Sequence, residues 1–454
     1  MTESLHIGNR VETFVDEYLL AEKNGVEITL NRPERREVVV MHDEPWEGDG
    51  TMGVSVVDDD GTFRMYYRAT FPENQNDRSE AQACAYAEST DGVHWTKPRF
   101  GFVAYGGSPK TNLLLRGSMC INFAPFRDTN PDCPADSRYK AICGLAPEGV
   151  FAYGSADGLR WRLLSDEPVM TKGAFDTMNI AFFDVNRKAY AAYTRYIDLT
   201  PDVSDLSLSV RAIQSSVSDD FIRWTDPVPN RYSAGAPREH LYTNATILCP
   251  GAEHMYFAFP MRFVPERHKV DEHLKVGVSD NVMMTSRDGV TWDRRFLQSW
   301  VPAGLNPHCW TQRSLTPLRG IVKTGDEFSM YVTENYMWSD MCVRRVTVPL
   351  YRFASVAAAR SGGEFTTRPI RLEGRELNIN YSTGGPGSVR VGVHDADGNA
   401  VPGFSITECD PIFGDELATA VSWNGSSDLA FLAGRDVTLR FELIDARVFA
   451  LQVR

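Results

Sequence analysis

The sequence predicts an all-β chain, a five-bladed β-propeller followed by a C-terminal β-sandwich. A segment of the form Ser-x-Asp-Gly-x-x-Trp occurs four times, at residues 89–95, 155–161, 218–224 and 286–292, with Phe221 in place of glycine in the third copy. Its tryptophans follow each other at intervals of 66, 63 and 68 residues, and a fixed period is typical of repeat proteins. Helical periodicity is nearly absent, whereas short aromatic and β-branched runs alternate with turn residues.

The repeated segment is typical of a hairpin turn. Its Ser and Asp can bond the local backbone, its Gly can adopt the tight turn position, and its Trp begins the returning strand. Around each tryptophan the sequence predicts three or four short strands. In the first two repeats these are residues 51–57, 63–69, 83–88, 93–97, 121–127, 139–144, 150–155 and 159–164. In the third and fourth they include residues 178–184, 189–196, 242–248 and 254–263.

A fifth and less regular repeat covers residues 300–355, with strands expected at 312–322, 327–336 and 342–350. Units of four antiparallel strands at this period form propeller blades, and residues 12–20 are expected to supply the strand that closes the ring. After residue 356 comes an expected linker or turn at 357–363, then strands at 389–394, 429–433, 437–443 and 448–453. These predict a sandwich with Trp423 in its core. We therefore expect two domains, residues 1–356 and 357–454.

Composition narrows the possible partners. The formal charge of −13 over 454 residues argues against nucleic acid and against an anionic membrane, because both are bound by basic surfaces. No run approaches the roughly 18 apolar residues of a membrane span. The first residues lack a basic region followed by an apolar run, so we expect a cytoplasmic protein. No metal or cofactor motif is present, and we expect none of either; a homo-oligomer is possible.

Radial repetition brings residues at matching positions of different blades to one face of the ring. Three acids lie just before inner strands at such positions, Asp49, Asp176 and Glu239, in the first, third and fourth repeats. Crowded carboxylates shift each other's pKa, which makes them candidate catalytic groups. Glu47 is the alternative acid in the first repeat, and Glu334 is an alternative proton donor.

Three arginines recur at the same sequence interval, and each ends the second strand of its repeat. They are Arg68, Arg195 and Arg262. They could neutralise the acids, or they could bind an anionic or hydroxyl-rich substrate through the guanidinium fork. Further aromatic and polar candidates for binding a sugar ring lie on the same strands. They are Trp46, Asn122, Asn179, His240, Tyr242, Trp310, Arg313 and Tyr336.

With these residues the chain resembles the five-bladed propeller glycosidases, which include the arabinanase and β-xylosidase family and the invertase and levanase family. The resemblance covers residues 36–355 in architecture, and the added sandwich is similar to the invertase branch. It implies that Glu239 is the general acid, that Asp49 is the base or nucleophile, and that Asp176 tunes the acid. The invertase-type Asn-Asp-Pro-Asn-Gly and Arg-Asp-Pro motifs are absent, which leaves the substrate open.

The leading hypothesis is therefore a glycoside hydrolase that cleaves a small oligosaccharide with a carboxylate pair. One alternative is a sialidase-like or lyase-like enzyme, in which the arginines bind an anionic sugar and Tyr242 or Tyr336 acts as nucleophile or base. Another is a propeller that binds carbohydrate or protein without catalysis, since a fold does not dictate a function.

Overall fold

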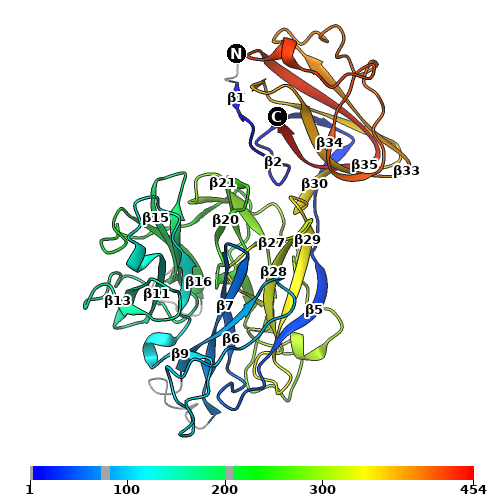
Figure 1. The fold of residues 1–454 in the computed structure, drawn as a ribbon. Helices are drawn as coiled ribbons and strands as arrows, with labels where there is room; N and C mark the ends of the chain where they lie inside the picture. The colour runs from blue at the N-terminus through cyan, green and yellow to red at the C-terminus, as the bar shows by residue number, and fades with distance from the viewer. Residues whose placement is uncertain (1–3, 73–81, 200–207) are drawn as a thin grey trace. The chain divides into compact units, whose positions relative to one another are not determined.

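The computed structural model describes residues 4–72, 82–199 and 208–454, and its contacts divide the chain into two compact units. One unit comprises residues 34–347, and the other combines residues 1–33 with 348–454. Both consist of β-sheets (Figure 1), and the described residues contain helix only as short 3₁₀ turns. The all-β class is therefore confirmed.

In residues 34–347, each of the first three repeats forms a four-stranded antiparallel sheet. The first contains β6 (Met52–Asp59), β7 (Thr62–Thr70), β8 (Gln82–Ser89) and β9 (Leu113–Arg116). The second contains β10 (Ala124–Arg127), β11 (Tyr139–Leu145), β12 (Gly149–Ser155) and β13 (Arg162–Leu163). The third contains β14 (Ile180–Asp184), β15 (Ala189–Asp198), β16 (Val210–Ser218) and β17 (Val228–Pro229).

The fourth repeat is divided between two sheets. One contains β19 (His240–Tyr242), β22 (Met261–Val264) and β23 (Val278–Asn281). The other contains β18 (Arg231–Tyr232), β20 (Ile247–Cys249), β21 (Ala252–Ala258), β24 (Met284–Ser286) and β25 (Thr291–Asp293). The chain changes sheet between β21 and β22 at Phe259-Pro260, where proline lacks the N–H that a continuous strand would need.

The fifth sheet joins the two ends of this unit. It contains β26 (Thr316–Pro317), β27 (Val322–Thr324), β28 (Glu327–Glu334), β29 (Cys342–Pro349) and β5 (Glu34–Met41). The closing pair is β29 with β5, from Cys342 opposite Met41 to Thr347 opposite Glu34, and in Figure 1 blue β5 runs beside yellow β29. Neighbouring sheets contact each other in chain order, and β28 contacts β6, so the sheets close into a ring.

The expectation that residues 12–20 close this ring is wrong. Within that segment only β2 (Glu12–Thr13) is a strand before residue 20, and it pairs with the C-terminal strand β35. Phe14 and Val15 are both buried, and the chain then turns where the Tyr18 amide donates to Asp16 Oδ1 at 3.0 Å. Two consecutive buried residues and a turn break the alternation that a strand requires.

The repeated Ser-x-Asp-Gly-x-x-Trp segments tie neighbouring sheets together. In the second copy, Ser155 Oγ accepts from the Gly158 amide at 2.9 Å, and Asp157 Oδ1 accepts from the Leu159 amide at 2.8 Å. Tyr66, from the preceding sheet, donates its hydroxyl to the Gly158 carbonyl at 3.0 Å. Equivalent bonds join Tyr193 to Gly289 at 2.8 Å and Tyr331 to Gly92 at 2.8 Å. The last of these joins the fifth sheet to the first.

The other unit is one ten-stranded sheet system that includes the N-terminal segment. Its further strands are β1 (Leu5–His6), β3 (Leu20–Asn24), β4 (Val26–Leu30), β30 (Ala354–Ala358), β31 (Gly363–Thr367), β32 (Ile370–Arg371), β33 (Leu377–His394), β34 (Asp415–Ala420) and β35 (Asp436–Val453). Strand β4 pairs with β30, and β3 pairs with β31. The units therefore divide at residues 33/34 and 347/348, whereas the sequence suggested one boundary after residue 356. Residues 357–363 lie within β30, a turn and the start of β31.

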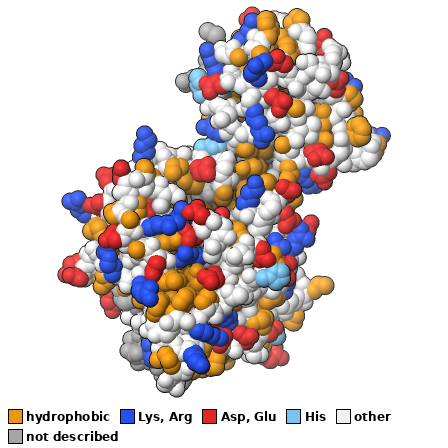
Figure 2. All heavy atoms as spheres, in the orientation of Figure 1, with side chains coloured by type: hydrophobic (Ala, Val, Ile, Leu, Met, Phe, Trp, Pro, Cys, Tyr) orange, Lys and Arg blue, Asp and Glu red, His pale blue; other side chains and the backbone are white. Residues whose placement is uncertain are grey.

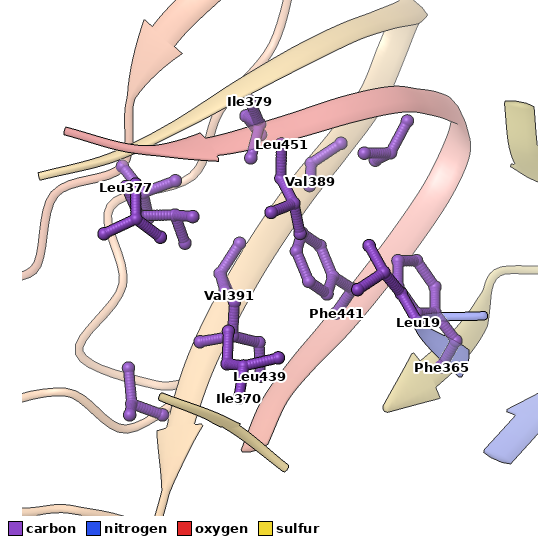
Figure 3. Close-up of a cluster of buried hydrophobic side chains, with 14 of the residues drawn as sticks. Leu19, Phe365, Ile370, Leu377, Ile379, Val389, Val391, Leu439, Phe441 and Leu451 are labelled. Carbon is purple, nitrogen blue, oxygen red and sulfur yellow. The ribbon is translucent and has the colours of Figure 1, made fainter. Parts of the chain in front are cut away.

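The core of this unit is aliphatic and aromatic. Figure 3 shows Phe365 and Phe441 beside Leu19, with Val389, Val391 and Leu439 from the long strands pointing toward the same interior. Trp423 is buried as expected and donates Nε1–H to the Val391 carbonyl at 2.8 Å. The strand expected at 429–433 is wrong, because residues Ala430–Leu432 form a 3₁₀ turn. Leu429 and Leu432 are buried while Phe431 is exposed, which is a helical spacing.

Candidate active site

A small pocket is lined by residues from all five repeats, and we name it the arginine pocket. Its volume is about 40 Å³. The lining residues are Met52, Arg68, Asn122, Asp176, Thr177, Arg195, Arg211, Tyr242, Thr243, Met261 and Arg313. Residues up to 261 positions apart in the sequence, from Met52 to Arg313, thus face one cavity. Residues from different repeats, far apart in the sequence, therefore converge on one cavity.

A contact between two threonines joins the third and fourth repeats at the pocket. The hydroxyls of Thr177 and Thr243 hydrogen-bond to each other, and each threonine follows another pocket residue, Asp176 or Tyr242. The fourth-repeat residue that shares the pocket with Asp176 is therefore Tyr242. Glu239, which the sequence placed at this position, lies three residues earlier.

Several lining residues have strained backbones. Asn122, Thr243 and Arg313 have positive φ angles of 57°, 55° and 63°, and Phe175, beside Asp176, has a φ of 55°. Such angles are rare in residues other than glycine, above all in a β-branched residue such as threonine. Strain of this kind costs roughly 1–3 kcal/mol per residue and concentrates at functional sites. Its recurrence in four different repeats around one cavity supports a functional role for the pocket.

Asn179 holds the loop that carries Asp176. Its Nδ2 donates to the carbonyls of Phe175 at 2.9 Å and Thr177 at 3.0 Å, and its Oδ1 accepts from the Arg195 amide at 3.2 Å. The side chain is buried and does not line the pocket. Asn179, a predicted binding residue, is therefore a positioning residue for Asp176 and Arg195.

Arg195 and Asp176 form an ion pair at the wall of the pocket. Arg195 Nη1 bonds Asp176 Oδ1, and the guanidinium lies over the Tyr242 ring, 5.4 Å from its centroid. The Asp176 side chain is 46% exposed, so its carboxylate remains accessible. Burial, together with the positive charges of Arg211 and Arg313, lowers the pKa of Arg195 to about 10. Arg195 is still a cation at neutral pH.

Arg211 is a second cation close to the Tyr242 ring. Its guanidinium lies 5.6 Å from the Tyr242 centroid and 4.9 Å from that of Phe263. The His240 Nδ1 accepts from the Arg211 amide at 3.1 Å. Burial and the charge of Arg211 lower the pKa of His240, which favours the neutral imidazole. His240, predicted to bind substrate, thus orients Arg211.

Tyr336 contacts two of the pocket arginines through its hydroxyl. Its hydroxyl contacts Arg313 Nη1 at 3.1 Å and Arg68 Nη2 at 3.4 Å. Burial alone would raise the pKa of Tyr336, but the two guanidinium charges and their hydrogen bonds outweigh it and hold the pKa below 10.0. Arg68 also donates to the Gly50 carbonyl at 2.6 Å and contacts Asn122 Oδ1 at 3.4 Å.

The pocket is strongly positive in an acidic protein. Four arginines line it, and Asp176 is the one acidic side chain among the described residues of its lining. Arg211 and Arg313 contact rings, a histidine and tyrosines instead of carboxylates. Figure 2 shows basic and acidic side chains interspersed over the visible face, and the chain as a whole carries −13. A local cluster of desolvated guanidiniums is suited to an anion.

Asp49 adjoins the pocket through its backbone. Its carbonyl accepts from the Met337 amide at 3.0 Å, and the next residue, Gly50, accepts from Arg68. Of the predicted residues, Arg68, Asn122, Asp176, Arg195, Tyr242 and Arg313 line the pocket. Asn179, His240 and Tyr336 contact its lining residues.

Glu239, Arg262 and Trp310 line a second pocket of about 420 Å³. Glu239 is paired with Arg294 at 2.6 Å, and Arg262 binds Asp280 through Nε at 2.9 Å and Nη2 at 2.6 Å. Side chains alternate along a strand, so Arg262 on β22 points away from the arginine pocket while Met261 faces it. Glu239, which directly precedes β19, and Tyr242, on β19, line different pockets. The structure does not bring Glu239 and Asp176 to one cavity.

The remaining predicted residues are buried elsewhere. Trp46 donates Nε1–H to Asn112 Oδ1 at 2.9 Å and belongs to a hydrophobic core. Glu47 accepts from Tyr67 at 2.5 Å and Lys97 at 2.7 Å, and burial raises its pKa. Glu334 is paired with Arg344 at 2.8 Å. None of these three lines the arginine pocket, so the structure gives them packing and ion-pair roles.

Sequence reasoning missed five lining residues, Met52, Thr177, Arg211, Thr243 and Met261. The two threonines could have been found by aligning Asp176-Thr177 with Tyr242-Thr243 at the repeat period. Arg211 gave no such signal, because no arginine occupies the matching place in the other repeats. Among the described residues no group of three or more His, Cys, Asp or Glu side chains could hold a metal ion, and no described helix is long and apolar enough to cross a membrane.

No family model and no curated protein matches the chain. It is similar to a solved glycoside hydrolase at 13% identity, covering 70% of this chain and 92% of that chain, with a TM-score of 0.49. It is also similar to an exo-inulinase from Aspergillus awamori (11%; 94% and 98%; TM-score 0.40). A third is a fructofuranosidase from Schwanniomyces occidentalis complexed with fructosylnystose (9%; 99% and 100%; TM-score 0.38). Glycoside hydrolases are thus among the solved structures to which this chain is similar.

Proposed function

We propose that residues 34–347 form a five-bladed β-propeller, that the other unit is a β-sandwich, and that the protein cleaves a glycosidic bond in a saccharide carrying a carboxylate or sulfate. The observation that carries the proposal is the convergence of Arg68, Arg195, Arg211 and Arg313 on one pocket. A guanidinium fork matches the geometry of carboxylate and sulfate oxygens. This is the anionic-sugar alternative of the sequence analysis, and the geometry favours it over a carboxylate pair.

The size of the pocket specifies what enters it. A volume of about 40 Å³ is far below the roughly 300–1,000 Å³ of pockets that enclose a small ligand. It accommodates a charged group of a few atoms, while the sugar ring lies at the mouth. The anionic group then fixes the orientation of the ring above Asp176 and Tyr242, and orientation contributes strongly to catalysis.

Asp176 and Tyr242 are the pocket residues with the chemistry to react. We assign Tyr242 as the nucleophile or base and Asp176 as the proton-transfer partner, because a carboxyl and a phenol can share the two steps of glycosidic cleavage, as in tyrosine-dependent sialidases. Arg195 and Arg211, at 5.4 and 5.6 Å from the Tyr242 ring centroid, would stabilise a developing phenolate charge.

A second candidate function is hydrolysis of a neutral oligosaccharide by carboxylates. The position of Asp49 favours it, since Asp49 adjoins the same pocket as Asp176 through Gly50 and Met337. Glu239 would then have to act from the second pocket. Asp49→Asn and Tyr242→Phe separate the two functions, because the first should abolish turnover only in the carboxylate mechanism and the second only in the tyrosine mechanism.

Arg211→Met tests the anionic substrate, since methionine keeps the packing on Phe263 and removes the charge. We expect glucuronate to bind the variant about 10–150-fold more weakly by calorimetry, equivalent to losing one charged hydrogen bond of about 1.5–3 kcal/mol. Arg162→Met is the control, because Arg162 is half exposed and paired with Asp136 at 2.6 Å outside the pocket. Wild-type glucuronate affinity in Arg211→Met, or preferential turnover of neutral aryl glycosides, would reject the proposal.

A further inference from the structure

Arg319 is a buried cation without a polar side-chain partner. It is 8% exposed, and its Nε is buried with no hydrogen-bond partner. No described residue forms a salt bridge or side-chain hydrogen bond with its guanidinium. Its neighbours are the ring faces of Phe126 and Phe182, with centroids 5.9 and 5.5 Å away. Cation–π contacts recover only part of the several kcal/mol that burial of an unpaired charge costs.

The backbone around Arg319 is held tightly against β6. The Arg319 amide donates to the Val54 carbonyl at 2.8 Å, and the Val56 amide donates to the Arg319 carbonyl at 2.8 Å. A Cβ on Gly320 would lie 2.5 Å from the Val56 carbonyl oxygen, so glycine is required for this close approach. The guanidinium is therefore carried by a fixed backbone and cannot leave the interior by a loop movement.

A second unpartnered donor lies beside it. Ser55 pairs with Arg319 in a parallel bridge, and its fully buried hydroxyl has no hydrogen-bond partner. Two donors from adjacent strands, one of them charged, have no acceptor among the described residues. Native proteins rarely leave such groups unsatisfied, and one small anion would satisfy both.

We propose that a small inorganic anion of the halide class binds inside the ring of sheets at Arg319 and Ser55. The site is separate from the arginine pocket, whose lining does not include these residues. Burial lowers the pKa of Arg319 to about 10, so the side chain remains charged at neutral pH and can hold the anion. The bound anion would stabilise the fold and takes no part in the reaction proposed above.

Chloride titration tests the site. The protein is unfolded thermally in increasing sodium chloride, with the ionic strength held equal by sodium acetate, whose anion is not a sugar acid. A specific anion raises the unfolding midpoint in proportion to the logarithm of its concentration, by about 2 °C per tenfold above its Kd for a domain of this size. Arg319→Met should remove this dependence and Ser55→Ala should weaken it. Arg211→Met, in the arginine pocket, should retain it.

Crystals soaked in bromide give a second readout on the wild-type protein, which does not depend on the folding of a variant. An anomalous peak within hydrogen-bond distance of the Arg319 guanidinium supports the proposal. Absence of that peak, equal chloride dependence in wild type and Arg319→Met, or loss of the dependence in Arg211→Met instead, would overturn it.

Discussion

The contact between Gly158 and Tyr66 makes a quantitative prediction about stability. Gly158 has a φ of +75°, and a Cβ added to it would lie 2.8 Å from Tyr66 Oη and 2.7 Å from Arg64 Nη1. Both side chains donate to this turn, Tyr66 to the Gly158 carbonyl at 3.0 Å and Arg64 to the Asp157 carbonyl at 2.5 Å. Gly158→Ala must therefore displace a buried hydroxyl from its acceptor.

Two contributions add to the loss of unfolding free energy in Gly158→Ala. An alanine in the left-handed conformation costs about 1–2 kcal/mol, and a buried hydroxyl left without its acceptor costs about 1–3 kcal/mol. We expect Gly158→Ala to lower the free energy of unfolding by about 2–5 kcal/mol. Gly61→Ala is the matched control, because Gly61 has a φ of +93° in the β6–β7 turn with nothing within 4 Å of an added Cβ. It should lose only the first contribution.

Urea unfolding followed by tryptophan fluorescence measures the difference. Of the nine tryptophans, all except Trp423 lie in residues 34–347, so the signal reports the unit that contains Gly158. The two alanine variants should differ by about 1–3 kcal/mol. Equal destabilisation would show that the tyrosine contact between sheets contributes nothing beyond backbone strain.

Two further predictions concern Phe221 and Tyr336. Phe221→Gly restores the glycine of the other copies, yet it should destabilise the protein by about 2–4 kcal/mol in the same urea assay. Loss of a buried phenylalanine costs about 3–5 kcal/mol, and relief of its φ of 68° returns only about 1 kcal/mol; its ring packs on Tyr190 and Phe126 at 5.1 and 5.7 Å. A more stable variant would contradict this. For Tyr336, Arg313→Met should raise the tyrosine pKa, because a lost cation disfavours the phenolate. In an ultraviolet titration the earliest tyrosine transition should then move to higher pH and should disappear in Tyr336→Phe; an unchanged transition in both variants would refute the assignment.

The sequence by itself determined the features that repeat. The spacing of four Ser-x-Asp-Gly-x-x-Trp segments identified the sheets, because each segment forms its turn through bonds within seven residues, such as Ser155 with Gly158. The same period led to Arg68, Asp176 and Arg195, which the structure brings to one pocket. Local hydrogen bonding and strand alternation are properties of neighbouring residues, so they can be read along the chain.

Only the tertiary structure decided the register between sheets and the pairing of distant segments. A shift of one residue turns a side chain to the opposite face, which is why Arg262 matched the repeat period approximately and still reached a different pocket from its neighbour Met261. The closing strand β5 and the pairing of β4 with β30 join segments about 300 residues apart, and no local pattern records such a partner. Arg211 reached the arginine pocket in the same way, through packing on Tyr242 and Phe263 that no spacing in the sequence records.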